Sequence, residues 1–182
     1  MALSLSGLVP SVNPYVTIVF LIPSYASYIL FLVAMKGLAK YYDEPKIFKN
    51  SLYPFIISST GGIISLLVAY TFITPILDEF SAYRSSPGNI TSASIFFSLF
   101  QVVAFIWLAV SVIGILNGFF YRRAFYALAE KSREQNFKQA GLFMIIGGIL
   151  MIIFVGGIIY FIGLIFAVLG FFNLKPKNSQ NE

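Results

Sequence analysis

The side chains that most often carry out chemistry in proteins are scarce in this sequence. Its 182 residues include no Cys and no His. Thiolate nucleophiles, imidazole bases, disulfides and most zinc sites are therefore excluded. Charged residues make up 10% of the chain, as twelve Lys and Arg and seven Asp and Glu. We expect no catalytic residue, no metal ligand and no cofactor site, and we expect that the protein is not an enzyme.

Two amides inside a long apolar stretch are the strongest polar candidates. Gln101 and Asn117 lie 16 residues apart, near opposite ends of that stretch. An amide in an apolar helix usually forms a hydrogen bond to a neighbouring helix, so we interpret both as interhelical polar contacts rather than substrate ligands. Most tyrosines, including Tyr15, Tyr53, Tyr70 and Tyr121, lie near the ends of apolar stretches, where aromatic rings prefer a membrane interface. We assign no site to them.

The positions of the charged residues indicate the elements that must hold these side chains. Four long intervals contain no charge: 1–35, 50–77, 85–121 and 139–174. A helix of about 20 apolar residues crosses a hydrocarbon core of about 30 Å. An ordinary soluble domain has roughly 25% charged residues, far more than this chain. The sequence therefore predicts an all-α integral membrane bundle with four hydrophobic segments.

The last hydrophobic segment is too long for one straight crossing. From Ala140 to Leu174 it would measure about 52 Å as a single helix. We favour a hairpin that turns at Gly156 and Gly157, where residues without a Cβ allow a tight reversal. One steeply tilted helix, with the glycines serving only close helix packing, is the alternative. The five predicted crossings are 15–38, 51–77, 93–120, 137–155 and 158–174.

The connecting segments predict the orientation in the membrane. Segments 36–49 and 121–138 are both net positive, whereas 78–92 is net negative. Short basic loops stay on the cytoplasmic side, so the first two are predicted inner loops and 78–92 is the outer loop. A hairpin in the last segment returns the tail 175–182 to the inside as well. The predicted location is the cell (cytoplasmic) membrane, with multiple crossings and a cytoplasmic carboxyl terminus.

The basic residues beside the crossings are interpreted as anchors at the membrane surface. Specific capture of an anionic lipid by Arg122 and Arg123 is the alternative. Nucleic acid is not an expected partner, because the bases are spread over three short segments. The outer loop also contains Asn89-Ile90-Thr91, a glycosylation acceptor pattern that chance alone could give. The predicted anchors are Lys36, Lys40, Lys49, Arg122, Arg123 and Lys138.

The two inner loops resemble one another and suggest a two-fold internal repeat. Leu38-Ala39-Lys40 precedes Phe48-Lys49-Asn50-Ser51 as Leu128-Ala129-Glu130 precedes Phe137-Lys138-Gln139-Ala140, with one residue dropped between the blocks. Chance similarity in a chain so rich in Ile, Leu and Phe is the alternative. A true repeat would make each unit a crossing, an inner loop and a crossing, related by an axis along the membrane normal.

Several juxtamembrane motifs resemble those of a known family. The motifs are Ile29 to Asp43 with Ile47-Phe48-Lys49-Asn50, Ala124 to Glu130, and the closing Gly170-Phe171-Phe172-Asn173-Leu174. They are similar to an archaeal membrane family labelled as a domain of unknown function, number nine hundred and ninety-six. The resemblance covers about 29–174 and implies a multi-pass helical membrane protein with a closing hairpin. It brings no catalytic or binding residues, and the family pattern implies a fuller first crossing than this chain has.

Two functions fit these observations. The first is a non-enzymatic assembly or accessory subunit of a membrane complex, which contacts membrane lipids and packs against other subunits or its own copies. Its support is the small-residue content and the absence of charge at membrane depth. The second is a small oligomeric pore or carrier for a neutral or lipid-like solute, with a path lined by Ser, Tyr, Gln101 or Asn117.

Overall fold

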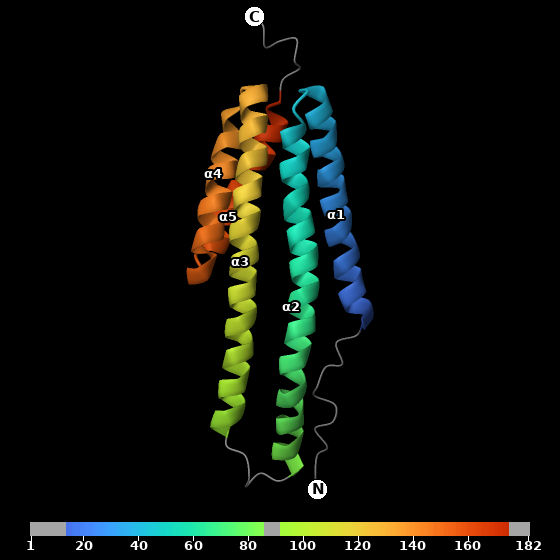
Figure 1. Ribbon diagram of the computed structural model, residues 1–182, viewed down its shortest axis with the longest axis vertical. Coiled ribbons are helices and arrows are strands. Elements are labelled where there is room, and N and C mark those ends of the chain that lie inside the picture. Colours follow the sequence, from blue (N-terminus) through green and yellow to red (C-terminus); the bar gives the residue numbers. More distant parts are fainter. Residues whose placement is uncertain (1–13, 86–91, 175–182) are drawn as a thin grey trace, which may run out of the picture.

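The protein is an all-α bundle in the computed structural model, which describes residues 14–85 and 92–174 (Figure 1). No strand occurs in these two ranges, and the predicted all-α fold is confirmed. Asn89 and the tail 175–182 lie outside the described residues. The helices are α1 (Pro14–Tyr41), α2 (Pro45–Ser85), α3 (Ser92–Ser132), α4 (Gln135–Leu150) and α5 (Gly156–Phe172), with a 3-10 turn at Met151–Ile153 between the last two.

The helices run alternately up and down, so that two connections and the end of α5 meet at one end of the bundle (Figure 1). We name this the basic end, because Lys36, Lys40, Lys49, Arg122, Arg123 and Lys138 lie in the helix turns that reach it. The predicted hairpin in the last hydrophobic segment is present as α4 and α5. Both of its helices are much shorter than α2 and α3, which continue beyond it.

The chain reverses slightly before Gly156 and Gly157, the two residues at which the sequence predicted the turn. The turn consists of Met151–Ile153, then Phe154 in the left-handed region with φ 64°, then Val155. Gly156 is already the first residue of α5. A Cβ there would overlap the Met151 amide nitrogen and the Gly147 carbonyl oxygen. The glycine is thus needed for close packing of α4 and α5, whereas a phenylalanine makes the reversal.

The long helices extend well past the predicted crossings. With 41 residues each, α2 and α3 measure about 61 Å, twice the hydrocarbon thickness of about 30 Å. Most residues of the predicted loops 36–49 and 121–138 are in helices. The Lys, Arg and Glu residues of these segments are good helix formers. By length and composition, three described stretches could cross a membrane: Pro45–Ile76, Phe96–Ser132 and Gln135–Ile153.

The two connections at the basic end each contain one residue with a positive φ. Asp43 has φ 53° and Arg133 has φ 59°, and each lies five residues after the Leu of its aligned motif. After α1 the Glu44 amide donates to the Ala39 carbonyl oxygen at 2.9 Å, which closes the helix end in a Schellman motif. Two helix pairs whose connections each contain such a residue agree with the internal repeat that the sequence suggests.

The packed core lies near the basic end, where all five helices meet. Phe125 and Phe137 are fully buried and stack with their ring centroids 5.9 Å apart. Glycines bring the backbones of α3, α4 and α5 close together: a Cβ at Gly148 would lie 2.5 Å from the Gly114 carbonyl oxygen. The other fully buried large side chains are Met35, Ile47, Leu128 and Met144.

Candidate functional site

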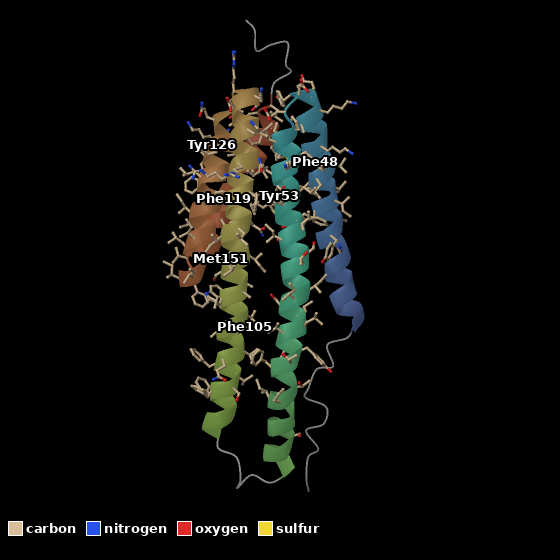
Figure 2. The ribbon with its side chains drawn as sticks, in the orientation of Figure 1. Phe48, Tyr53, Phe105, Phe119, Tyr126 and Met151 are labelled. Atoms are coloured by element: carbon tan, nitrogen blue, oxygen red, sulfur yellow. The ribbon has the colours of Figure 1, made fainter. Side chains whose placement is uncertain are left out.

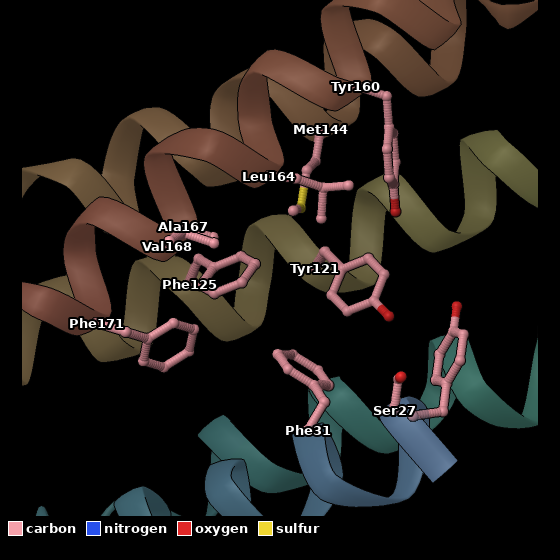
Figure 3. Close-up of a pocket in the computed structure, with 11 residues that line it drawn as sticks. Ser27, Phe31, Tyr121, Phe125, Met144, Tyr160, Leu164, Ala167, Val168 and Phe171 are labelled. Carbon is pink, nitrogen blue, oxygen red and sulfur yellow. The ribbon is translucent and has the colours of Figure 1, made fainter. Parts of the chain in front are cut away.

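A cavity of about 340 Å³ lies between α1 and the body formed by α3, α4 and α5 (Figure 3). It is large enough for a small ligand, since ligand pockets start at about 300 Å³. No charged side chain lines it. The lining residues are Ser27, Tyr28 and Phe31 of α1, Tyr121 and Phe125 of α3, Met144 of α4, and Tyr160, Leu164, Ala167, Val168 and Phe171 of α5.

Hydroxyl groups gather at one end of the cavity. The hydroxyls of Tyr121, Tyr160 and Ser27 point toward one another (Figure 3), and Tyr28 also lines the cavity. The Ser27 hydroxyl donates to the Pro23 carbonyl oxygen at 2.8 Å, so it offers the cavity only its acceptor capacity. This end can donate to and accept from one polar group of a ligand.

The other end of the cavity is aromatic. Phe31 meets Tyr121 edge to face at 6.0 Å between ring centroids, and Phe125 meets Phe171 in the same way at 6.4 Å. Phe125 is fully buried in the core. These rings are held by the bundle itself, so the apolar half of the cavity is preformed.

The cavity opens toward the side of the bundle. Two of its α5 residues, Leu164 and Val168, are 43% and 52% exposed. On the opposite wall, α1 packs chiefly against α2 rather than α5. The cavity is therefore accessible from the side of the bundle, between α1 and α5.

The two amides singled out in the sequence lie in different surroundings. Asn117 is buried, and its Nδ2 donates to the Ser58 hydroxyl at 2.7 Å, which links α3 to α2. Its Oδ1 is buried and accepts no hydrogen bond. Gln101 is exposed on the part of α3 far from the basic end. The structure brings neither amide into the lining of the cavity.

The six predicted anchors all have exposed side chains near the basic end. Arg122 and Lys138 both lie over the Tyr126 ring, at 5.2 and 6.0 Å from its centroid. Arg123 lies instead over Phe119 at 4.3 Å, on the side of α2. Among the described residues, no group of three His, Cys, Asp or Glu could hold a metal ion.

Sequence reasoning missed the tyrosines of the cavity. It treated Tyr121 as one of several interface residues, and it did not single out Tyr28 or Tyr160. A usable signal existed in Tyr28, which lies in the middle of the predicted crossing 15–38 rather than at its end. A hydroxyl at that depth needs a partner. The other tyrosines of the cavity are on α3 and α5, however, and sequence spacing alone does not relate these helices to α1.

The described residues form a bundle of long apolar helices with a cavity that opens to its side. Three stretches of these helices are long and apolar enough to cross a membrane. The chain belongs to the family described as Protein of unknown function (DUF996), whose model matches residues 23–165, and the resemblance stated from the sequence is confirmed. It is 24% identical over 157 residues to Uncharacterized protein MJ1644 of Methanocaldococcus jannaschii, covering 86% of this chain and 81% of that protein. No solved structure matches the chain.

Proposed function

We propose that the protein is a non-enzymatic protein of the cytoplasmic membrane that binds and carries a neutral, lipid-like molecule. The observation that carries this proposal is the division of the cavity into a hydroxyl end and an aromatic end. An apolar molecule with one carbonyl or hydroxyl group fits such a cavity. A charged ligand does not, because the lining offers no countercharge.

The orientation predicted from the basic loops is compatible with the same proposal. With the basic end on the cytoplasmic side, the cavity lies beside the inner half of the membrane. The hydroxyl end is then the deeper one, because Ser27 and Tyr160 are farther along their helices from the basic end than Phe31 and Phe171. The ligand would hold its polar group inward, toward the membrane centre.

Removing two cavity hydroxyls should reduce the amount of bound lipid. We expect Tyr121→Phe with Tyr160→Phe to keep the fold, since the rings remain. Each lost hydrogen bond of about 1 kcal/mol should weaken binding about fivefold. The measurement is mass spectrometry of neutral lipids extracted from the purified protein, normalised to protein. Tyr53→Phe with Tyr126→Phe is the matched control, because these tyrosines lie outside the cavity.

A second variant tests the cavity without touching its hydroxyls. Val168→Trp adds bulk at the exposed rim, where the fold can accept it. We expect it to exclude the same lipid that the tyrosine variant loses. If all variants retained the wild-type amount of neutral lipid, or if no lipid accompanied the wild-type protein, the carrier proposal would be wrong.

A second candidate function is assembly through helix packing with a copy of the same chain. The supporting observation is that α2 and α3 continue beyond the other three helices (Figure 1). On this part of α2 and α3, Tyr70, Phe96 and Phe100 are 69%, 71% and 61% exposed, and Gln101 offers an exposed amide. Apolar rings and an amide are what a neighbouring membrane helix can cover and hydrogen-bond.

The assembly proposal predicts a position-dependent loss of association. We expect Phe100→Ala with Gln101→Leu to lower energy transfer between labelled copies in lipid vesicles by more than half. Phe172→Ala is the control, because Phe172 is also exposed, at 83%, but lies at the basic end. A wild-type protein that remains a lone protomer in detergent and in vesicles, with no co-purifying protein, would remove this candidate.

A further inference from the structure

A second cleft lies between α2 and α3 at the basic end, on a different side of α3 from the tyrosine cavity. Its volume is about 700 Å³. Lys46, Lys49, Asn50 and Tyr53 line it from α2, at the spacing that places residues on one helix face. Phe120 and Arg123 line it from α3, one turn apart. The cleft is therefore built by two helix faces that the bundle holds against each other.

The charge of this cleft is of one sign. Three cationic side chains line it and no carboxylate does. The nearby Glu44 is turned to Lys131, whose Nζ lies 3.6 Å from its carboxylate. Salt bridges from Lys46, Lys49 or Arg123 do not occur among the described residues. The three charges therefore remain available to an anion.

Aromatic rings shape the cleft and hold one of its charges. The Arg123 guanidinium lies over the Phe119 ring at 4.3 Å from its centroid, which restricts the motion of the side chain. Tyr53 and Phe120 are in contact with their centroids 4.7 Å apart. Both lie one turn from the charges toward the middle of the bundle, so they close the cleft on its apolar side. Figure 2 shows Tyr53 and Phe119 at the same height on neighbouring helices.

We propose that this cleft binds the phosphate-bearing headgroup of an anionic membrane lipid. A guanidinium, two ammonium groups, an amide and a phenol supply hydrogen-bond donors, and phosphate oxygens accept them. The cleft lies where the charged residues meet the apolar segments, which is the depth of lipid phosphates. Below it, on the same two helix faces, the exposed side chains of Ile64 and Leu116 are apolar and can contact the lipid tails.

Two other cations at the basic end, Arg122 and Lys138, do not line this cleft. Arg122 and Lys138 lie over a single tyrosine ring, Tyr126, outside the cleft. They carry the same charges as Arg123 and Lys49, and all four residues are exposed. This pair is therefore a matched control, because a membrane attracted only by net charge would respond alike to both pairs.

The test is binding of a fluorescent phosphatidic acid to the purified full-length protein in vesicles of zwitterionic phosphatidylcholine. We expect Lys49→Gln with Arg123→Gln to weaken binding at least tenfold, and Arg122→Gln with Lys138→Gln to weaken it less than threefold. Thermal unfolding of each variant checks the fold. Arg123→Lys should weaken binding several-fold, because it keeps the charge but loses the planar guanidinium.

Two results would overturn the proposal. Equal weakening by the two glutamine pairs would show that the lipid responds to net charge and not to this cleft. Displacement of the lipid by inorganic phosphate or glycerol phosphate at equal concentration would show a site for a free phosphate, not for a membrane lipid. Because the cleft and the tyrosine cavity share no residue, neither result affects the proposed carrier function.

Discussion

Replacing Gly156 by alanine should disrupt the α4–α5 hairpin, whereas the same replacement at the adjacent Gly157 should not. A Cβ at Gly156 would overlap backbone atoms of Met151, Gly147 and Leu150, and a backbone cannot rotate away as a side chain can. At Gly157 a Cβ meets nothing within 4 Å. We expect Gly156→Ala to cost about 3 kcal/mol, at the upper end for overpacking of a core. Thermal unfolding in detergent should show a drop of order 10 °C.

The Gly157→Ala variant shows whether replacing a helical glycine by alanine raises or lowers stability when no clash occurs. Neither glycine has a positive φ, so alanine suits the backbone at both positions and by propensity alone would stabilise a helix by about 0.5–1 kcal/mol. Gly157→Ala should therefore unfold at or slightly above the wild-type temperature. Equal destabilisation by both variants would mean that α4 and α5 do not pack as closely as the structure has them.

The sequence predicted the bundle because its strongest signal is length without charge. The intervals between charges determine where helices must be, and the 35 residues of the last segment required a reversal. The residue at which the chain reverses was harder to predict. It uses Phe154 in a left-handed conformation, which is uncommon for a bulky residue. The glycine pair that suggested the turn serves the contact between helices instead.

The candidate sites were much harder to predict, because each one joins helices distant in sequence. Lys49 and Arg123 were recognised as cations beside crossings, but only the pairing of α2 with α3 places them around one cleft. Tyr28 and Tyr121 come together in the same way from α1 and α3. Periodicity describes the face of one helix and contains no information about which other face it meets.

The turn of the hairpin should be inaccessible to water from either side of the membrane, so that α4 and α5 do not make the two full crossings expected from the sequence at 137–155 and 158–174. As a helix of 16 residues, α4 measures about 24 Å, less than the hydrocarbon thickness of about 30 Å. The turn lies beside Trp107, which is 15 residues before Arg122 and so about 22 Å deeper along α3. Its side chains Ile152, Ile153, Phe154 and Val155 are all apolar and 49–68% exposed.

Several peptide groups of the turn have hydrogen-bond partners, which hydrocarbon surroundings would require. Trp107 Nε1 donates to the Ile152 carbonyl oxygen at 3.1 Å, and the Phe154 amide donates to the Met151 carbonyl oxygen at 3.2 Å. The Trp107 and Phe154 rings stack with their centroids 3.7 Å apart, which places the indole N–H at the turn. A turn in water would need no such partner for its carbonyl group.

Because the chain has no Cys, single cysteine variants can be labelled without background. We expect Ile153→Cys to react with a membrane-impermeant maleimide less than one-tenth as much as Lys40→Cys or Ser81→Cys, whichever side of the vesicle receives the reagent. All three should react fully after denaturation. Lys40 and Ser81 report on the two ends of the bundle. Labelling of Ile153→Cys from the side that labels Ser81→Cys would mean that the hairpin crosses the whole membrane.

Trp107→Phe tests whether the hairpin turn lies in hydrocarbon while it keeps the aromatic packing against the turn. It retains an aromatic ring to stack on Phe154 but removes the donor to the Ile152 carbonyl oxygen. In hydrocarbon that carbonyl group finds no water, and we expect a loss of about 1–3 kcal/mol in the free energy of unfolding within lipid. At a hydrated outer surface water would replace the indole, and the loss would be near zero. The labelling and the stability measurement thus test the depth of the turn by independent physical effects.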